Sequence, residues 1–245
     1  MSAVRTAQAR ELLRTAQVSP KAFMVLYYSV LVLLDVLISF LPSEGLAGMF
    51  ITTLSELFSW VLGAGLVLYF MGIRRRERME FATLFDGFSF AGKLIALNLV
   101  VNAFTALWSL LLVFPGFIAF YRYRFAAYNL YENPDIGIFE ALDRSKRQTR
   151  GMKMQLFNLD LSYFGWIVLA ALPNLIVNIS QYISVGGDVT AYLSLSTPLP
   201  LSLLCTAWSF AVALFYLPNW QCVLLDYYDA AKAATQEPPA APDFL

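Results

Sequence analysis

The chain has 245 residues, of which 59% are apolar and only 14% are charged. A soluble globular domain has roughly 45–50% apolar and about 25% charged residues, so this composition predicts an all-α integral membrane protein. The 17 basic and 17 acidic residues balance, which leaves no overall field to favour nucleic acid as a partner. Histidine is absent, which excludes histidine-based nucleophilic catalysis and histidine-ligated metal.

The N-terminal segment, residues 1–20, places Arg5, Arg10 and Arg14 between apolar side chains. Such a pattern is typical of a short basic helix that lies along an anionic membrane face. Ser19 and Pro20 suit the N-cap and the first residue of the helix that follows. The next apolar run is too long for the core of a signal peptide, so we expect it to be retained as the first crossing.

Six apolar runs predict a membrane domain over residues 21–227. The expected crossings are 22–41, 48–71, 94–114, 116–132, 154–178 and 201–225. The fourth crossing is short, and the sequence Pro115-Gly116 predicts a helix break where it begins. The proline-rich tail, residues 228–245, is predicted to be disordered and cytoplasmic.

The distribution of basic residues supports six crossings with both termini in the cytoplasm. With six crossings, 15 of the 17 Lys and Arg residues lie on one side, and the turns on the other side contain none. Cytoplasmic loops of membrane proteins carry such an excess of positive charge. If residues 116–132 stayed on the surface, the basic cluster between Arg144 and Lys153 would face outward, against the same rule.

The segment 134–153 predicts an amphipathic elbow helix on the cytoplasmic surface. Ile138, Ala141 and Leu142 share one face, and basic side chains cover the rest. We expect the basic loops to contact anionic lipid headgroups. The residues predicted to do so are Arg74, Arg75, Arg76, Arg78, Arg144, Lys146, Arg147, Arg150 and Lys153.

Four charged residues fall inside the predicted crossings: Asp35, Glu56, Arg122 and Arg124. At about 1.5 Å per residue, Arg122 and Asp35 both lie about 21 Å from the cytoplasmic face, and Arg124 and Glu56 about 18 Å. We therefore predict an intramembrane polar set made of two separate pairs. Three interpretations stay open: the arginines extend to the headgroups, the pairs fix the packing of the helices, or the charges line a pathway.

The stretches LWSLLLVFPGFIAFYRYRFAAYNLYENPD and EALDRSKRQTRGMKMQLFNLDLSYFGW resemble the bacterial multi-pass family catalogued as domain of unknown function 975. Asp35 and Glu56 are not part of the family's sequence pattern that this chain matches. The matching positions are Leu107, Trp108, Pro115, Gly116, Asn133, Pro134, Ser145, Gly151, Phe157, Leu161, Ser162, Gly165 and Trp166. The resemblance implies a bacterial integral membrane protein, distantly similar to the membrane domain that accompanies some glycerophosphodiester phosphodiesterases, and it implies no activity.

Two hypotheses for the function follow. In the first, the protein is a non-enzymatic module of the bacterial cytoplasmic membrane that binds lipid, another membrane protein or a second copy of itself, and supports envelope assembly or integrity. In the second, it is a small transporter or exporter that uses Asp35, Glu56, Arg122 and Arg124. The sequence has no HExxH motif, glycine-rich phosphate loop or Cys-x-x-Cys pair, so neither catalysis nor a cofactor nor a metal is expected.

Overall fold

The computed structural model describes residues 11–13, 16, 18–41, 45–111, 113–193, 195 and 197–236. All regular secondary structure in those residues is helical, in agreement with the predicted all-α class. Most of the segment predicted as a basic interfacial helix, and the last nine residues of the predicted tail, lie outside the described residues.

The helices follow one another with short connections. In chain order they are α2 (Pro20–Ser39), α3 (Gly45–Arg74), the 3-10 helix η1 (Phe81–Phe90), α4 (Ala91–Leu111), α5 (Val113–Arg122), α6 (Ala126–Glu132), α7 (Ile138–Gln148), α8 (Lys153–Ser184), α9 (Val189–Leu193) and α10 (Leu199–Gln236). Among the described residues, five segments are long and apolar enough to cross a membrane, which indicates a multi-pass membrane protein. They are Pro20–Ser39, Gly45–Arg74, Phe81–Leu110, Lys153–Ser184 and Leu199–Thr235.

The fourth predicted crossing is not one continuous helix. α5 ends at Arg122 and α6 begins at Ala126, so the chain turns between them. A helix break does precede this segment, but α4 ends at Leu111 and α5 begins at Val113, so Pro115 and Gly116, where the break was predicted, lie in the first turn of α5. Proline is tolerated there since the first N–H groups of a helix have no partner within the helix.

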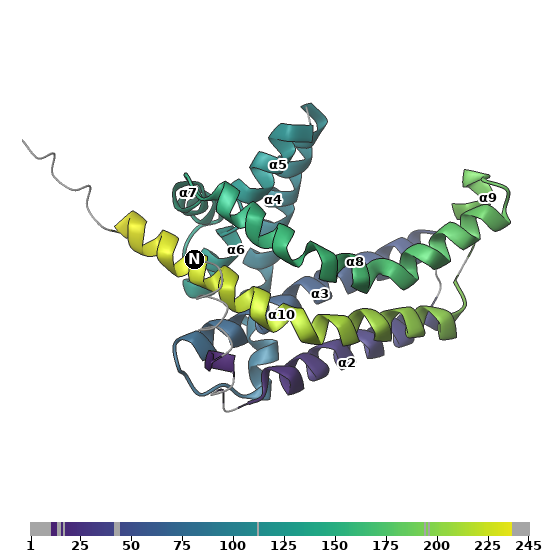
Figure 1. Ribbon diagram of the computed structural model, residues 1–245, viewed down its shortest axis with the longest axis horizontal. Helices are drawn as coiled ribbons and strands as arrows, with labels where there is room; N and C mark the ends of the chain where they lie inside the picture. The colour runs from purple at the N-terminus through teal and green to yellow at the C-terminus, as the bar shows by residue number, and fades with distance from the viewer. Residues whose placement is uncertain are drawn as a thin grey trace, which may run out of the picture.

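Gly116 instead allows α4 and α5 to pack closely, side by side (Figure 1). A Cβ on Gly116 would lie 2.1 Å from Oγ and 2.9 Å from Cα of Ser109 on α4. Because no real Cβ approaches a neighbouring backbone atom that closely, a larger residue would push the two helices apart. The Pro-Gly step therefore lies in the first turn of α5, and Gly116 allows the short distance between α5 and α4.

The last helix is longer than its apolar run. α10 continues to Gln236, so residues 228–236, predicted to be disordered, are helical. The reason is tertiary: the hydroxyl of Tyr228 donates to Glu132, and Asp229 forms an ion pair with Arg74 at 2.7 Å. The hydropathy of the sequence identifies only the part of a helix that fits the hydrocarbon core of the membrane. The contacts of Tyr228 and Asp229 stabilise α10 beyond that part.

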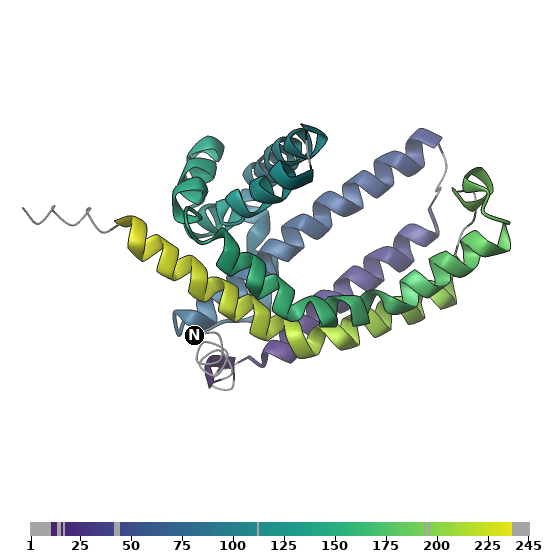
Figure 2. The ribbon, with the colours of Figure 1, turned by 45° about the horizontal axis from the view of Figure 1, so that its top comes forward.

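Figure 1 shows α2, α3, α8 and α10 extending toward one end, while α4 and α5 form a pair that projects away from them. α8 and α10 also run side by side in the turned view of Figure 2. The indole N–H of Trp208 donates to the carbonyl of Leu169 at 2.9 Å, and the Ser209 hydroxyl donates to that of Ala170 at 2.8 Å. Hydrogen bonds of this kind hold helices together where hydrophobic association is weak.

The buried residues form two clusters, one among α2, α3, η1, α8, α10 and the α5–α6 connection, and the other among α3, α4, α5, α6 and α7. Phe23 stacks on Tyr69 with ring centroids 3.9 Å apart, and Phe125 packs against Tyr228 at 5.4 Å. Far from these clusters the surface is apolar: Leu46 and Leu110 are each 87% exposed. Such an exterior suits lipid, where exposed aliphatic side chains carry no cost.

Candidate functional site

The break between α5 and α6 is stabilised by side chains of α7. The backbone N–H of Phe125 donates to the Ser145 hydroxyl at 3.1 Å, and that hydroxyl donates to the Arg122 carbonyl at 2.9 Å. The Thr149 hydroxyl contacts the same carbonyl at 3.2 Å. Ser145 and Thr149 are both 0% exposed. Two buried hydroxyls thus satisfy backbone groups that the broken helix leaves free, and they fix Arg122 beside α7.

A buried amide pair fixes α7 against α6. Asn129 and Gln148 exchange two hydrogen bonds of 2.9 Å, and both side chains are buried. The hydroxyl of Tyr228 on α10, which donates to Glu132, also lies 3.1 Å from the side-chain oxygen of Asn129, so three helices share one polar network. The apolar face predicted for α7 is the buried one, since Ala141 and Leu142 are almost fully covered. The basic face of α7 is therefore left on the outside.

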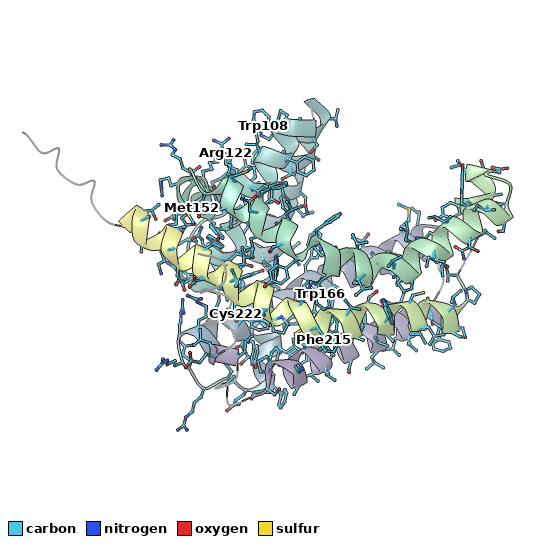
Figure 3. All side chains as sticks on the ribbon, viewed as in Figure 1. Trp108, Arg122, Met152, Trp166, Phe215 and Cys222 are labelled. Atoms are coloured by element: carbon cyan, nitrogen blue, oxygen red, sulfur yellow. The ribbon has the colours of Figure 1, made fainter. Side chains whose placement is uncertain are left out.

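A basic pocket of about 670 Å³ opens where the end of α5, the outer face of α7 and the start of α8 meet. Figure 3 labels Arg122 at the end of α5 and Met152 just before α8. The pocket is lined by Arg122, Asp143, Lys146, Arg147, Arg150, Gly151, Lys153 and Met154. Five cationic side chains and one carboxylate therefore share one cavity.

The one carboxylate of the pocket does not neutralise it. Asp143 pairs with Lys146 at 2.7 Å. The hydrogen bond from Lys146 lowers the pKa of the Asp143 carboxyl, with further contributions from the charges of Lys146, Arg147 and Arg122. Arg122 and Lys153 line the same pocket, and their positive charges repel each other. This arrangement favours an anionic ligand.

Other arginines predicted to contact lipid serve different purposes. Arg74 is only 18% exposed and bonds Asp226 at 3.1 Å and Asp229 at 2.7 Å, which joins α3 to α10. Arg75 pairs with Glu132, and Arg144 pairs with Glu140 at 2.6 Å. Arg76 and Arg78 are exposed and form no ion pair within the described part of the chain.

The four predicted intramembrane charges do not form one group. Asp35 and Glu56 are exposed on α2 and α3, close enough for their charges to repel each other. Arg122 lines the basic pocket. Arg124 lies 3.4 Å from Asp160 of α8, a different partner from the expected Glu56.

Asp160 is the acceptor of a polar cluster among α5, α8 and α10. Besides Arg124, it accepts hydrogen bonds from the Tyr121 hydroxyl at 3.1 Å and the Trp220 indole at 3.0 Å. The guanidinium of Arg124 also lies 5.2 Å from the centre of the Trp220 ring. With 16% exposure for Arg124 and 22% for Asp160, the pair is mostly enclosed by protein. The cluster gives the guanidinium of Arg124 an ion-pair partner and an aromatic contact, which lipid alone would not supply.

Comparison with known proteins places this arrangement in a family. The family model described as protein of unknown function (DUF975) matches residues 98–235, more than half of the chain. The chain belongs to the DUF975 family. No curated protein and no solved structure matches it.

The DUF975 segment contains the whole basic pocket and the Asp160 cluster, whereas Asp35, Glu56 and the arginines from 74 to 78 lie before it. Sequence reasoning identified the basic residues of the pocket but missed the side chains that shape it. Ser145 already belonged to the pattern by which the family was recognised. A serine on the otherwise apolar face of α7 was the available signal, as were Asn129 and Gln148.

Proposed function

We propose that this DUF975 protein is a non-enzymatic module of the bacterial cytoplasmic membrane that binds anionic lipid at one end of its helices and supports envelope assembly or integrity. In this proposal the chain passes through the membrane six times, with both termini in the cytoplasm. α5 and α6 together make the fourth passage, as a broken segment whose free backbone groups are covered by α7.

The topology is supported by contacts between the ends of the helices. Lys93, near the start of α4, donates a hydrogen bond of 2.6 Å to the carbonyl of Pro134, just after α6. Arg74 at the end of α3 pairs with α10, and Arg75 pairs with Glu132 of α6. These contacts bring the ends together, and in the proposed topology they lie on the side that the positive-inside rule assigns to the cytoplasm.

One observation carries the proposal: this end presents cations that no carboxylate in the described part of the chain neutralises. Arg76, Arg78, Arg147 and Arg150 are exposed and have no ion-pair partner among the described residues. Each basic residue near an anionic leaflet contributes about 1 kcal/mol of attraction. The membrane surface supplies the missing negative charge.

The proposal is tested by thermal unfolding in nanodiscs that contain zero to 50% phosphatidylglycerol in phosphatidylcholine, so that the anionic fraction spans about half the lipid. We expect the melting temperature to rise with the anionic fraction. In the variant R76Q/R78Q/R147Q/R150Q this rise is lost, and in the matched variant R76K/R78K/R147K/R150K, which keeps the charges, it is retained. A wild-type melting temperature independent of phosphatidylglycerol contradicts the proposal.

The transporter hypothesis gains no specific support. Arg124 is paired with Asp160, while Asp35 and Glu56 lie on exposed helix faces. The charges that it requires are therefore not gathered along one route.

A further inference from the structure

The basic pocket differs from a diffuse positive surface because its shape is fixed. Hydrogen bonds between buried groups hold two of its walls, α5 and α7, together. The Arg122 carbonyl accepts hydrogen bonds from both Ser145 and Thr149, so the residue at the end of α5 is held against α7. Phe125 in that connection and Ala126 at the start of α6 are 0% exposed. The cavity of about 670 Å³ lies within the roughly 300–1,000 Å³ that is usual for ligand pockets. A preformed site of this kind loses little entropy when it binds.

We propose that this pocket is a discrete site for the phosphomonoester headgroup of a lipid. The assignment rests on the proposed function, in which this end of the helices faces an anionic leaflet. It adds a single saturable site and the chemical class of its ligand.

The charges favour a phosphomonoester over a phosphodiester. Of the five cations, Lys146 is paired with Asp143, and Arg122, Arg147, Arg150 and Lys153 have no carboxylate partner among the described residues. A phosphomonoester carries up to two negative charges and three unsubstituted oxygens. A phosphodiester carries one charge and has two oxygens in ester bonds. The doubly charged group therefore accepts more charge-assisted hydrogen bonds from these arginines.

The neighbouring surface favours a lipid over a soluble phosphate. Ile118 lies one helical turn before Arg122 on α5 and is 54% exposed, and Phe157 lies one turn after Lys153 on α8 and is 39% exposed. Met154, which lines the pocket, is 66% exposed. Apolar side chains thus continue from the basic pocket along α5 and α8, where acyl chains attached to a bound headgroup would lie.

The test is isothermal titration of the protein in zwitterionic nanodiscs with dioctanoyl phosphatidate, and with empty nanodiscs as the reference. We expect one phosphatidate per chain. Dioctanoyl phosphatidylglycerol, a phosphodiester, binds at least about tenfold more weakly, because it carries one charge less. Glycerol 3-phosphate, which has the same phosphomonoester without acyl chains, is also at least about tenfold weaker.

Variants locate the site. Arg122→Gln and Arg150→Gln each weaken phosphatidate binding by about tenfold or more, and Arg122→Lys retains part of the affinity. Lys21→Gln, an exposed charge at the start of α2 and outside the pocket, is the matched control and leaves the affinity unchanged. Because Arg150 is exposed, its variant tests the site even if Arg122→Gln disturbs the fold. Affinity for phosphatidate rises as the pH passes through about 6, where a phosphomonoester acquires its second charge.

Three results overturn the inference: equal affinity for phosphatidate and phosphatidylglycerol, equal affinity for phosphatidate and glycerol 3-phosphate, or an effect of Lys21→Gln as large as that of Arg150→Gln. These results leave the proposed function intact if phosphatidylglycerol still stabilises the protein in nanodiscs. Saturable phosphatidate binding without that stabilisation contradicts the proposed function instead.

Discussion

The Nζ atom of Lys93 lies 2.6 Å from the carbonyl oxygen of Pro134, although 41 positions separate them in the sequence. The contact brings the start of α4 and the end of α6 to the same level of the molecule. α4 is 21 residues long, or roughly 30 Å at 1.5 Å per residue, so the return through α5 and α6 spans the same distance. If α4 crosses the membrane, the broken pair α5–α6 crosses back.

This topology predicts which cysteines an impermeant thiol reagent reaches. Asp135→Cys, between α6 and α7, is labelled from the cytoplasmic side only, and Val189→Cys, at the start of α9, from the outside only. Wild-type protein is the control, because its two thiols, Cys205 and Cys222, are buried. If α5–α6 did not cross, the two substituted cysteines would exchange sides, which right-side-out and inverted vesicles distinguish.

The hydroxyl of Ser145 is predicted to stabilise the helix break. Ser145→Ala leaves the buried N–H of Phe125 without its acceptor, so we expect a loss of about 1–3 kcal/mol in the free energy of unfolding. Ser89→Ala is the matched control, because its exposed hydroxyl contacts only the nearby carbonyl of Asp86. Unfolding in mixed micelles with increasing dodecyl sulfate measures both variants. Equal stability of the two would show that the break does not depend on α7.

The contacts of Asp160 predict that removing its charge lowers the free energy of unfolding more than removing the charge of Glu56. Asp160→Asn removes the ion pair of Arg124, and we expect a cost of about 1–3 kcal/mol because the pair lies between the buried and surface cases. Glu56→Gln removes an exposed charge that has no ion pair among the described residues and costs less than about 0.5 kcal/mol. Unfolding in mixed micelles with increasing dodecyl sulfate measures both variants. A larger loss of stability in Glu56→Gln than in Asp160→Asn would contradict the structure.

Close packing of α3 on η1 makes Gly65 sensitive to substitution. A Cβ on Gly65 would lie 2.0 Å from the carbonyl oxygen of Leu84, so Gly65→Ala requires the backbone of η1 to move. We expect a loss of about 1–3 kcal/mol. Gly92→Ala is the control, since nothing lies within 4 Å of its added Cβ. A melting temperature of Gly65→Ala equal to that of Gly92→Ala would refute the close approach.

The local pattern of apolar residues was sufficient to predict the long helices. The runs predicted at 22–41 and 154–178 correspond to α2 (Pro20–Ser39) and α8 (Lys153–Ser184), because apolar length is what a bilayer demands of a helix. Pro20 also begins α2, as its fixed φ angle favours. The face of α7 that is buried followed from the spacing of its apolar residues.

The break and the charge pairs depend on contacts between distant residues. No residue near Tyr123 in the sequence predicts a turn there, because the hydroxyls that stabilise the turn come from Ser145 on α7 and from Thr149 directly after it. Depth along a helix matched Arg124 with Glu56, but depth does not say which helices are neighbours. α5 packs against α8, so Arg124 reaches Asp160.

The most direct test of the central claim is the lipid composition of native nanodiscs that polymer extracts around the protein from its own membrane. The cations exposed at one end of the helices predict that anionic headgroups are enriched at least about twofold over the bulk membrane. They also predict that R76Q/R78Q/R147Q/R150Q returns the composition to that of the bulk. A wild-type protein surrounded by lipid of bulk composition would contradict the assignment of anionic lipid as its partner.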